Sequence, residues 1–328
     1  MTESRKERMA YLGALALLFS YAESMLPRFA PFFRLGLSNV AVLSSLSLDF
    51  PSFLALCVVK SASSSLVSGT LFSPFFIVSI AQSVVSGSFM FALPRIFGKR
   101  ISVYGVSVSG AAVSSAVQVF LCSLYLGSGT FVFFGPMLVF SVFSGIFTAF
   151  VCSALKIRIE GMPPAASAPL VEPQKTECGT FARSVLLLPV VFFLFALVFS
   201  TDRISLLVSV FVVAAALQKM SGRRFLFVPH FYMWVFVFLS SVFVPDGKVV
   251  FRIWKFSVTD GALLLAAEKC VRLSSSICLS RFASSVPLPK NSVVSLSIAH
   301  FHAMTARFES GGMKGRNFVE RLRFVVNG

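Results

Sequence analysis

The stretch PRFAPFFRLGLSNVAVLSSLSL, Pro27 to Leu48, is an apolar segment that polar residues interrupt. Most of it is apolar enough for lipid, yet Arg34, Gly36, Ser38 and Asn39 stand in its middle, after two prolines. Irregular backbone is tolerated at membrane depth where it is buried in protein or lines a cavity. The segment is therefore either a poor spanning helix or a helix that bends around something polar.

Composition identifies the chain as an integral membrane protein. Hydrophobic residues make up 56% of the 328 positions and charged residues only 13%, whereas soluble proteins carry about 25% charged residues. The formal net charge of +16 would suit a nucleic-acid-binding protein, but the basic residues punctuate apolar runs. That pattern is typical of membrane topology, so we expect the lipid bilayer, and no nucleic acid, as a partner.

The apolar runs predict an all-α protein of about ten helices, because a spanning helix needs about 20 predominantly apolar residues. Residues 1–155 are expected to form a six-helix bundle, and residues 156–183 a proline-rich cytoplasmic linker. Residues 184–328 are expected to form a second membrane domain, with roughly four membrane or interfacial helices and a basic cytoplasmic tail. The predicted segments are 9–27, 29–48, 52–71, 74–93, 102–126, 131–155, 184–200, 204–217, 225–244 and 258–286.

The distribution of basic residues predicts the orientation. If the N-terminus is cytoplasmic, the loops on that side carry more Lys and Arg than the outer loops, as the positive-inside rule requires. Both termini are then cytoplasmic in a multi-pass protein of the cytoplasmic membrane, and the first apolar run is an uncleaved span. Segment 258–286 stays open: it carries Glu268 and Arg272 at i and i+4, and it either spans or lies at the membrane surface.

We expect no metal centre, disulfide framework or cofactor. The six cysteines form no CxxC pair, and most lie in apolar runs, where cysteine behaves as a small apolar residue. His230, His300 and His302 have no Cys or carboxylate at ligand spacing.

Polar residues inside the predicted spans form the candidate substrate site, because a polar or ionisable group in lipid is costly. They suggest a pocket that opens outward and whose excess of cations suits an anionic or amide-bearing ligand. An internal ion pair of Glu23 with Arg34 or Lys60 is the alternative, although one carboxylate cannot neutralise both cations. The candidates are Glu23, Arg34, Asn39, Lys60, Gln82 and Gln118.

Small residues at four-residue spacing predict close contacts between helices. Ala10 and Ala14 lie on one face of the first predicted helix. Gly110, Ser114 and Gln118 form a stripe at i, i+4 and i+8. This stripe suits either tight packing or the wall of a pocket.

Four motifs in the first half carry a resemblance to a known family. They are SYAES (20–24), RLGLSNVAVL (34–43), VKSASSSLVSGTLF (59–72) and VSVSGAAVSSAVQ (106–118). In that order they resemble the Gx transporter family, also named heptaprenyl diphosphate synthase component I. Its members are similar to the six-helix substrate-binding subunits of energy-coupling factor transporters, so the resemblance implies a membrane subunit that binds a substrate.

Several positions depart from the family pattern. Arg34 stands where a Lys is frequent, Ser38 replaces an Ala, and Lys60 stands where an Arg is common. Ser114 and Ser115 replace a His-Asn pair. Because two strongly polar groups have become hydroxyls, the resemblance does not identify the ligand.

The second half resembles, over short stretches, the transmembrane coupling subunit of the same transporters. The stretches are TDGALLLAAEKCVRLSSSICLSRF (259–282) and MKGR (313–316). This resemblance favours docking of cytoplasmic ATPase subunits on the basic tail through Arg307 and Arg316, whose guanidinium forks suit carboxylates. We expect two surface helices in this tail, and adhesion to anionic lipid explains its charge equally well.

We therefore expect a transport component that binds a small molecule from the outer face and passes it inward. The chain has no Walker A motif, so ATP-driven transport would need separate ATPase subunits. The alternative is a non-catalytic accessory subunit of isoprenoid or heptaprenyl diphosphate metabolism, and a structural scaffold is a third possibility. We expect no enzyme, because no aspartate-rich motif is present to bind Mg²⁺ and a diphosphate.

Overall fold

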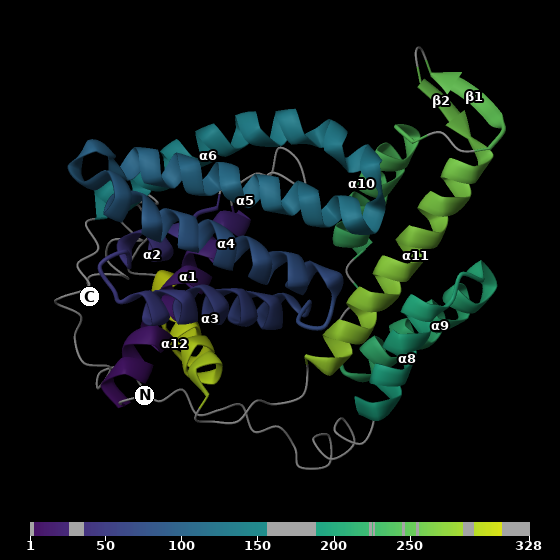
Figure 1. The fold of residues 1–328 in the computed structure, drawn as a ribbon. Coiled ribbons are helices and arrows are strands. Elements are labelled where there is room, and N and C mark those ends of the chain that lie inside the picture. The colour runs from purple at the N-terminus through teal and green to yellow at the C-terminus, as the bar shows by residue number, and fades with distance from the viewer. Residues whose placement is uncertain are drawn as a thin grey trace.

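The computed structural model describes residues 3–25, 36–155, 188–222, 225, 227–244, 247–253, 256–284 and 292–309. These residues are almost entirely helical, apart from one two-stranded hairpin, which confirms the predicted all-α membrane fold (Figure 1). Among them, four helical segments are long and apolar enough to cross a membrane: Phe50–Ser68, Pro74–Phe97, Val103–Leu126 and Ser128–Leu155. The predicted linker 156–183, Arg34 and Arg316 lie outside the described residues.

Within residues 3–25 and 36–155, six α-helices form the N-terminal bundle, as the sequence predicts. Two short 3-10 helices, η1 (Gly98–Arg100) and η2 (Ser128–Phe133), lead into the last two of them. The α-helices are α1 (Glu3–Met25), α2 (Asn39–Ser44), α3 (Phe50–Ser68), α4 (Pro74–Phe97), α5 (Val103–Leu126) and α6 (Phe134–Leu155).

Local sequence determines where these helices begin. The Asp49 carboxylate accepts a hydrogen bond from the backbone N–H of Ser52 (3.3 Å) at the start of α3. The Ser102 hydroxyl accepts one from the N–H of Gly105 (3.2 Å) at the start of α5. Both contacts satisfy N–H groups that have no partner inside the helix.

Helices α3 to α6 run up and down beside one another. The Ser61 hydroxyl donates to Ser83 Oγ (2.7 Å) between α3 and α4, and the Ser107 hydroxyl donates to the Gly145 carbonyl (2.8 Å) between α5 and α6. Because consecutive helices are antiparallel, the α3–α4 connection and η2 lie at the same end of the bundle, which we call the η2 end (Figure 1).

The second span differs from expectation in the part that the structure describes. Segment 29–48 was predicted to cross the membrane, but its described residues hold only the six-residue helix α2. Gly36 precedes α2 with a φ of +69°, a left-handed conformation that favours glycine. Here the interruption in the opening stretch is a real break in regular structure.

The second half consists of short apolar helices around one long helix, α11 (Asp260–Ala283). It begins with α8 (Leu188–Ser200), α9 (Ile204–Met220) and α10 (Phe227–Val242). Cys278 and Phe282 of α11 share an apolar cluster with α8 and α9, and Cys270 and Leu273 share one with α10. α11 is therefore packed inside the protein rather than lying alone on a surface, although its charged residues keep it out of the apolar candidate spans.

A β-hairpin precedes α11, where no strand was predicted. β1 (Val249–Ile253) pairs antiparallel with β2 (Phe256–Thr259). Both strands are rich in β-branched and aromatic residues, which favour extended backbone.

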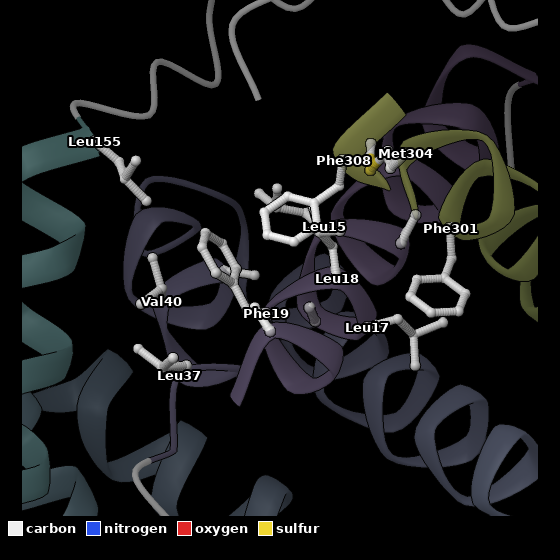
Figure 2. Close-up of a cluster of buried hydrophobic side chains, with 14 of the residues drawn as sticks. Leu15, Leu17, Leu18, Phe19, Leu37, Val40, Leu155, Phe301, Met304 and Phe308 are labelled. Carbon is white, nitrogen blue, oxygen red and sulfur yellow. The ribbon is translucent and has the colours of Figure 1, made fainter. Parts of the chain in front are cut away.

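The last described helix, α12 (Val293–Glu309), lies along α1 (Figure 1). Figure 2 shows Phe301, Met304 and Phe308 of α12 gathered with Leu15 and Leu18 of α1 in one buried apolar cluster. The helix expected in this part of the tail is present, and its apolar face is buried against the N-terminal bundle, while His302 and Arg307 on its other side are exposed.

Candidate functional site

The break before α2 is held by Glu23 near the end of α1. The Glu23 carboxylate accepts hydrogen bonds from the backbone N–H groups of Gly36 (3.2 Å) and Leu37 (3.1 Å). Buried backbone N–H groups that leave regular structure need another acceptor. Glu23 thus stabilises the irregular backbone at Gly36 and Leu37, just before α2.

Lys60, from the middle of α3, lies beside the start of α2. Its ammonium donates a hydrogen bond to Oδ1 of Asn39, and its side chain is buried, with 9% of its surface exposed. Glu23 is near enough to attract the ammonium electrostatically, but no ion pair within 4 Å joins these two described residues. The structure thus brings together Glu23, Asn39 and Lys60, without the direct Glu23–Lys60 ion pair that the sequence left open.

Several hydrogen-bond donors remain around Lys60. An ammonium has three N–H donors, and the described contacts of Lys60 use one of them. Ser63, one turn further along α3, is fully buried, and its hydroxyl has no hydrogen-bond partner among the described residues. Asn39 also has an amide NH₂, since its Oδ1 accepts from Lys60. We call Asn39, Lys60 and Ser63 the donor cluster.

Gln82 and Gln118 form a second polar contact, between α4 and α5. Gln82 Nε2 donates to Gln118 Oε1 (2.9 Å) and approaches the Ser114 carbonyl (3.4 Å). Ser61 adjoins Lys60, Ser83 adjoins Gln82, and their hydroxyls are hydrogen-bonded. The glutamine pair and the donor cluster therefore lie at a similar level of the bundle, although no contact between them is found in the described residues.

The small residues lie at close helix contacts. Ala10 and Ala14 are completely buried in α1. A Cβ on Gly110 would lie 2.3 Å from Met90 Cγ, which supports the packing interpretation of that stripe. A Cβ on Gly13 would lie 2.6 Å from Ser297 Oγ of α12. Gly13 and Ser63 could not be singled out from the sequence, because each is a small residue in a segment rich in small residues. Their roles follow from the structure, in which Gly13 faces Ser297 and the Ser63 hydroxyl is buried without a described partner.

A third group of ionisable residues joins the two halves of the chain. Arg272 Nη2 is 2.6 Å from Glu268 Oε1, which is the predicted i,i+4 pair, and 3.3 Å from Asp202 Oδ1. Lys269 Nζ donates to the carbonyl of Leu126 (2.6 Å) at the end of α5. The Lys269 contact places this part of α11 at the η2 end of the bundle, while Arg272 is paired within the second half.

The predicted docking residues are only partly described. Arg307 is exposed near the end of α12, and Arg316 lies outside the described residues. Within the described part of the chain, no three His, Cys, Asp or Glu side chains are grouped as a metal site would require.

Two family models match parts of the chain. Residues 184–286 match a domain of unknown function, DUF8519, and residues 12–155 match the model described as heptaprenyl diphosphate synthase component I. Searches of curated proteins and of solved structures found no match. The donor cluster lies inside residues 12–155, whereas α12 lies outside both matched regions. The resemblance of the N-terminal bundle to the heptaprenyl diphosphate synthase component I family is thereby confirmed over residues 12–155.

Proposed function

We propose that the N-terminal bundle binds a small anionic or amide-bearing molecule at the donor cluster and passes it across the membrane. The observation that carries this proposal is the environment of Lys60: a buried ammonium whose hydrogen-bond partner is a neutral amide. A buried cation is costly unless it is paired and hydrogen-bonded. The nearest carboxylate, that of Glu23, accepts from two backbone N–H groups instead.

The chemistry of the cluster favours a ligand rich in hydrogen-bond acceptors. Lys60 offers positive charge and N–H donors that no described residue accepts, Asn39 offers an amide NH₂, and Ser63 offers a buried hydroxyl. Carboxylate, phosphate and amide oxygens accept from all three donors. The broken backbone beside the cluster supports a transport role, because such breaks in membrane helices accompany substrate sites.

The proposal includes a direction and partners. The ligand enters from the outer face of the cytoplasmic membrane, both termini are cytoplasmic, and separate ATPase subunits drive transport. Arg307 and Arg316 would lie on the cytoplasmic side, where such subunits could dock. The cation distribution along the sequence supports this orientation.

A second candidate function rests on the family description. That description names a component of heptaprenyl diphosphate synthase, and a diphosphate is an anion that the donor cluster could accept. The chain would then be a non-catalytic membrane subunit, because it has no aspartate-rich motif with which to hold Mg²⁺.

The two functions are tested by thermal unfolding of the full chain in detergent with added ligands. The probes are inorganic phosphate, inorganic diphosphate, citrate, glutamine and farnesyl diphosphate. We expect at least one probe to raise the melting temperature of the wild-type protein, since a ligand that binds only the folded state stabilises it. Lys60→Met should abolish this rise, and Lys219→Met, at an exposed position on α9, should retain it.

The pattern of responses separates the candidates. A rise with farnesyl diphosphate alone favours the accessory role, and a rise with a small anion or glutamine favours transport. If no probe shifts the melting temperature, or if Lys60→Met keeps the full shift, binding at the donor cluster is wrong.

A further inference from the structure

Two buried hydrogen-bond donors lack an acceptor where the two halves of the chain meet. They are the Tyr125 hydroxyl, at the end of α5, and the Nε–H of Arg272, in the middle of α11. Both atoms are shielded from solvent, and neither has a hydrogen-bond partner among the described residues. A buried donor without an acceptor is costly, and native proteins leave few of them. An occupant that the described chain does not supply is therefore expected here.

Independent contacts place these two donors in one small region. The ring of Tyr125 is 6.4 Å from that of Phe199 in α8, and Arg272 donates to the carbonyl of Thr201, two residues later (2.8 Å). Lys269 of α11 donates to the carbonyl of the residue that follows Tyr125 (2.6 Å), where α11 passes the end of α5 (Figure 1). Arg272 is also near enough to the Tyr125 hydroxyl to act on it electrostatically. The donors thus lie together between α5, α8 and α11.

The charge of this region is positive. Lys269 and Arg272 carry two positive charges, and Glu268 carries one negative charge and pairs with Arg272 at 2.6 Å. Asp202 is 3.3 Å from Arg272, but its side chain is 93% exposed, so solvent screens its charge. Among these four residues, one positive charge of the buried part is therefore left without a buried counter-charge.

The unused hydrogen-bonding groups in this region are mainly donors. The Lys269 ammonium has three N–H groups, and its described contacts use one of them. The Nε–H of Arg272 can only donate, and the Tyr125 hydroxyl can donate as well. A water molecule would need acceptors for its own hydrogens, whereas an anion only accepts. Positive charge and donors from three side chains therefore favour an anion over water.

We propose that a small carboxylate or hydrogencarbonate ion binds between Tyr125, Lys269 and Arg272 and holds the two halves of the chain together. Its oxygens accept from the tyrosine hydroxyl, the Nε–H and the ammonium. Tyr125 belongs to the matched region 12–155 and the two cations belong to the matched region 184–286, so the ion contacts both. This site is separate from the donor cluster and independent of the ligand that binds there.

Hydrogen exchange at the junction tests for the ion. The full chain in detergent is exchanged in potassium formate or potassium hydrogencarbonate, and in potassium chloride of the same ionic strength and pH. We expect the peptides that contain residues 121–133 and 265–275 to exchange more slowly in at least one of the first two salts. An ion that holds α5 to α11 opposes local opening, and its effect saturates with concentration. Lys60→Met should show the same protection, because the donor cluster is not involved.

Removal of one hydroxyl group locates the ion. Tyr125→Phe keeps the aromatic ring beside Phe199 and removes only the unpartnered hydroxyl, so it should fold and bind the ion roughly tenfold more weakly. The matched control, Tyr104→Phe, removes the same group from an exposed ring at the start of α5 and should keep the wild-type affinity. Arg272→Lys removes the Nε–H but keeps the positive charge beside Glu268, and it should weaken binding as well.

Protection that Tyr125→Phe loses and Tyr104→Phe keeps would assign the ion to this junction. The ion site is refuted if neither formate nor hydrogencarbonate slows exchange at the junction relative to chloride, which would leave the two donors to water. Equal responses of the two tyrosine variants would refute it too.

Discussion

At the scale of single residues, Lys60 of the donor cluster and the nearby Glu23 have different roles. Glu23 accepts from two backbone N–H groups at the break before α2, and Lys60 donates a hydrogen bond only to the amide oxygen of Asn39 among the described residues. The first role concerns the stability of the fold, and the second leaves a cation available for a ligand. Substitutions at the two positions should therefore separate stability from binding.

Glu23→Gln should destabilise the fold and leave ligand binding largely intact. A glutamine presents one carbonyl oxygen where the carboxylate presents two, so one backbone N–H keeps a neutral acceptor and the other loses its acceptor, at a cost of about 1–3 kcal/mol. Thermal unfolding in detergent measures this loss. Asp202→Asn removes the same charge from a side chain that is 93% exposed and should change stability little; equal losses in the two variants would contradict the capping role.

Gly145 and Gly135 of α6 provide a matched pair of packing variants. A Cβ on Gly145 would lie 2.6 Å from Val108 Cα of α5, whereas a Cβ on Gly135 would meet nothing within 4 Å. Gly145→Ala should lower the free energy of unfolding by about 1–3 kcal/mol, because backbone cannot move aside as a flexible side chain can. Gly135→Ala should be neutral or stabilising, since alanine favours helix. Equal melting temperatures for the two variants would show that α5 and α6 are not packed this closely.

At the scale of helices, the contact between α1 and α12 connects the two ends of the described chain. Gly13 of α1 faces Ser297 of α12, and the rings of Tyr11 and His300 are 6.5 Å apart in an edge arrangement. Small residues allow such close approach between helices. The contact therefore has both an apolar part, shown in Figure 2, and a polar part near the start of α1.

A cysteine pair tests this contact directly. A Cβ on Gly13 would lie 3.2 Å from Ser297 Cβ, close to the 3.5–4.5 Å or so that disulfides span. Gly13→Cys with Ser297→Cys should form a disulfide under mild oxidation, detected as a linked peptide by mass spectrometry. Each single variant should give no such peptide. Failure of the double variant to link, with both thiols reactive, would place α12 elsewhere.

The same contact should weaken in acid. Burial lowers the pKa of His300, with a smaller opposing effect from Glu7; Tyr11, His302 and Arg307 are the other titratable groups near it on the two helices. The neutral imidazole is therefore favoured in the folded state, and its stabilisation is lost as the pH falls below about 6.5. Between pH 8 and pH 5.5 the melting temperature of the wild type should fall further than that of His300→Phe. A larger fall of the melting temperature in His300→Phe than in the wild type would contradict a stabilising role for the neutral imidazole.

The positions of the helices could be predicted from the sequence better than the elements that pack against each helix. The apolar runs of α3 to α6 are long and bounded by Asp49, Pro74 and Ser102, so periodic burial and capping residues locate them within a few positions. The apolar face of α12 was visible too, but sequence alone does not say what buries it, and the structure shows that α1 does.

The hairpin was missed because its strands are short and the pattern there does not distinguish a strand from a loop. Likewise, Glu23 and Lys60 were found as ionisable residues in apolar runs, whereas Ser63 resembles its serine neighbours.

At the scale of the whole molecule, α11 joins the second half to the η2 end of the first. The backbone N–H of Phe72, in the α3–α4 connection, donates to Ser280 Oγ (3.0 Å), and Lys269 donates to the carbonyl of Leu126. A Cβ on Gly129 of η2 would lie 2.0 Å from the Ser240 carbonyl of α10. The two halves thus meet through close backbone contacts, not only through apolar surface.

Ser280→Ala should loosen this junction locally. Without the hydroxyl, the Phe72 N–H loses its acceptor, and its hydrogen exchange should accelerate roughly fivefold, which corresponds to about 1 kcal/mol. Exchange mass spectrometry of the peptide around Phe72 measures the change. Ser276→Ala is the control, because the Ser276 hydroxyl donates to the Arg272 carbonyl within α11 itself. Unchanged exchange in Ser280→Ala would show that this bond does not hold the halves together.

The packing of α12 on α1 also constrains how the protein is made. α1 leaves the ribosome well before α12, the helix that covers Leu15 and Leu18. At about 5–20 residues per second, the interval between Met25 and Val293 is on the order of 10–50 s. During that time the covering surface for α1 does not yet exist. We therefore expect the insertion machinery or a membrane chaperone to shield α1 until α12 has been made. A ribosome that stalls before Val293 would release a chain whose α1 lacks this cover.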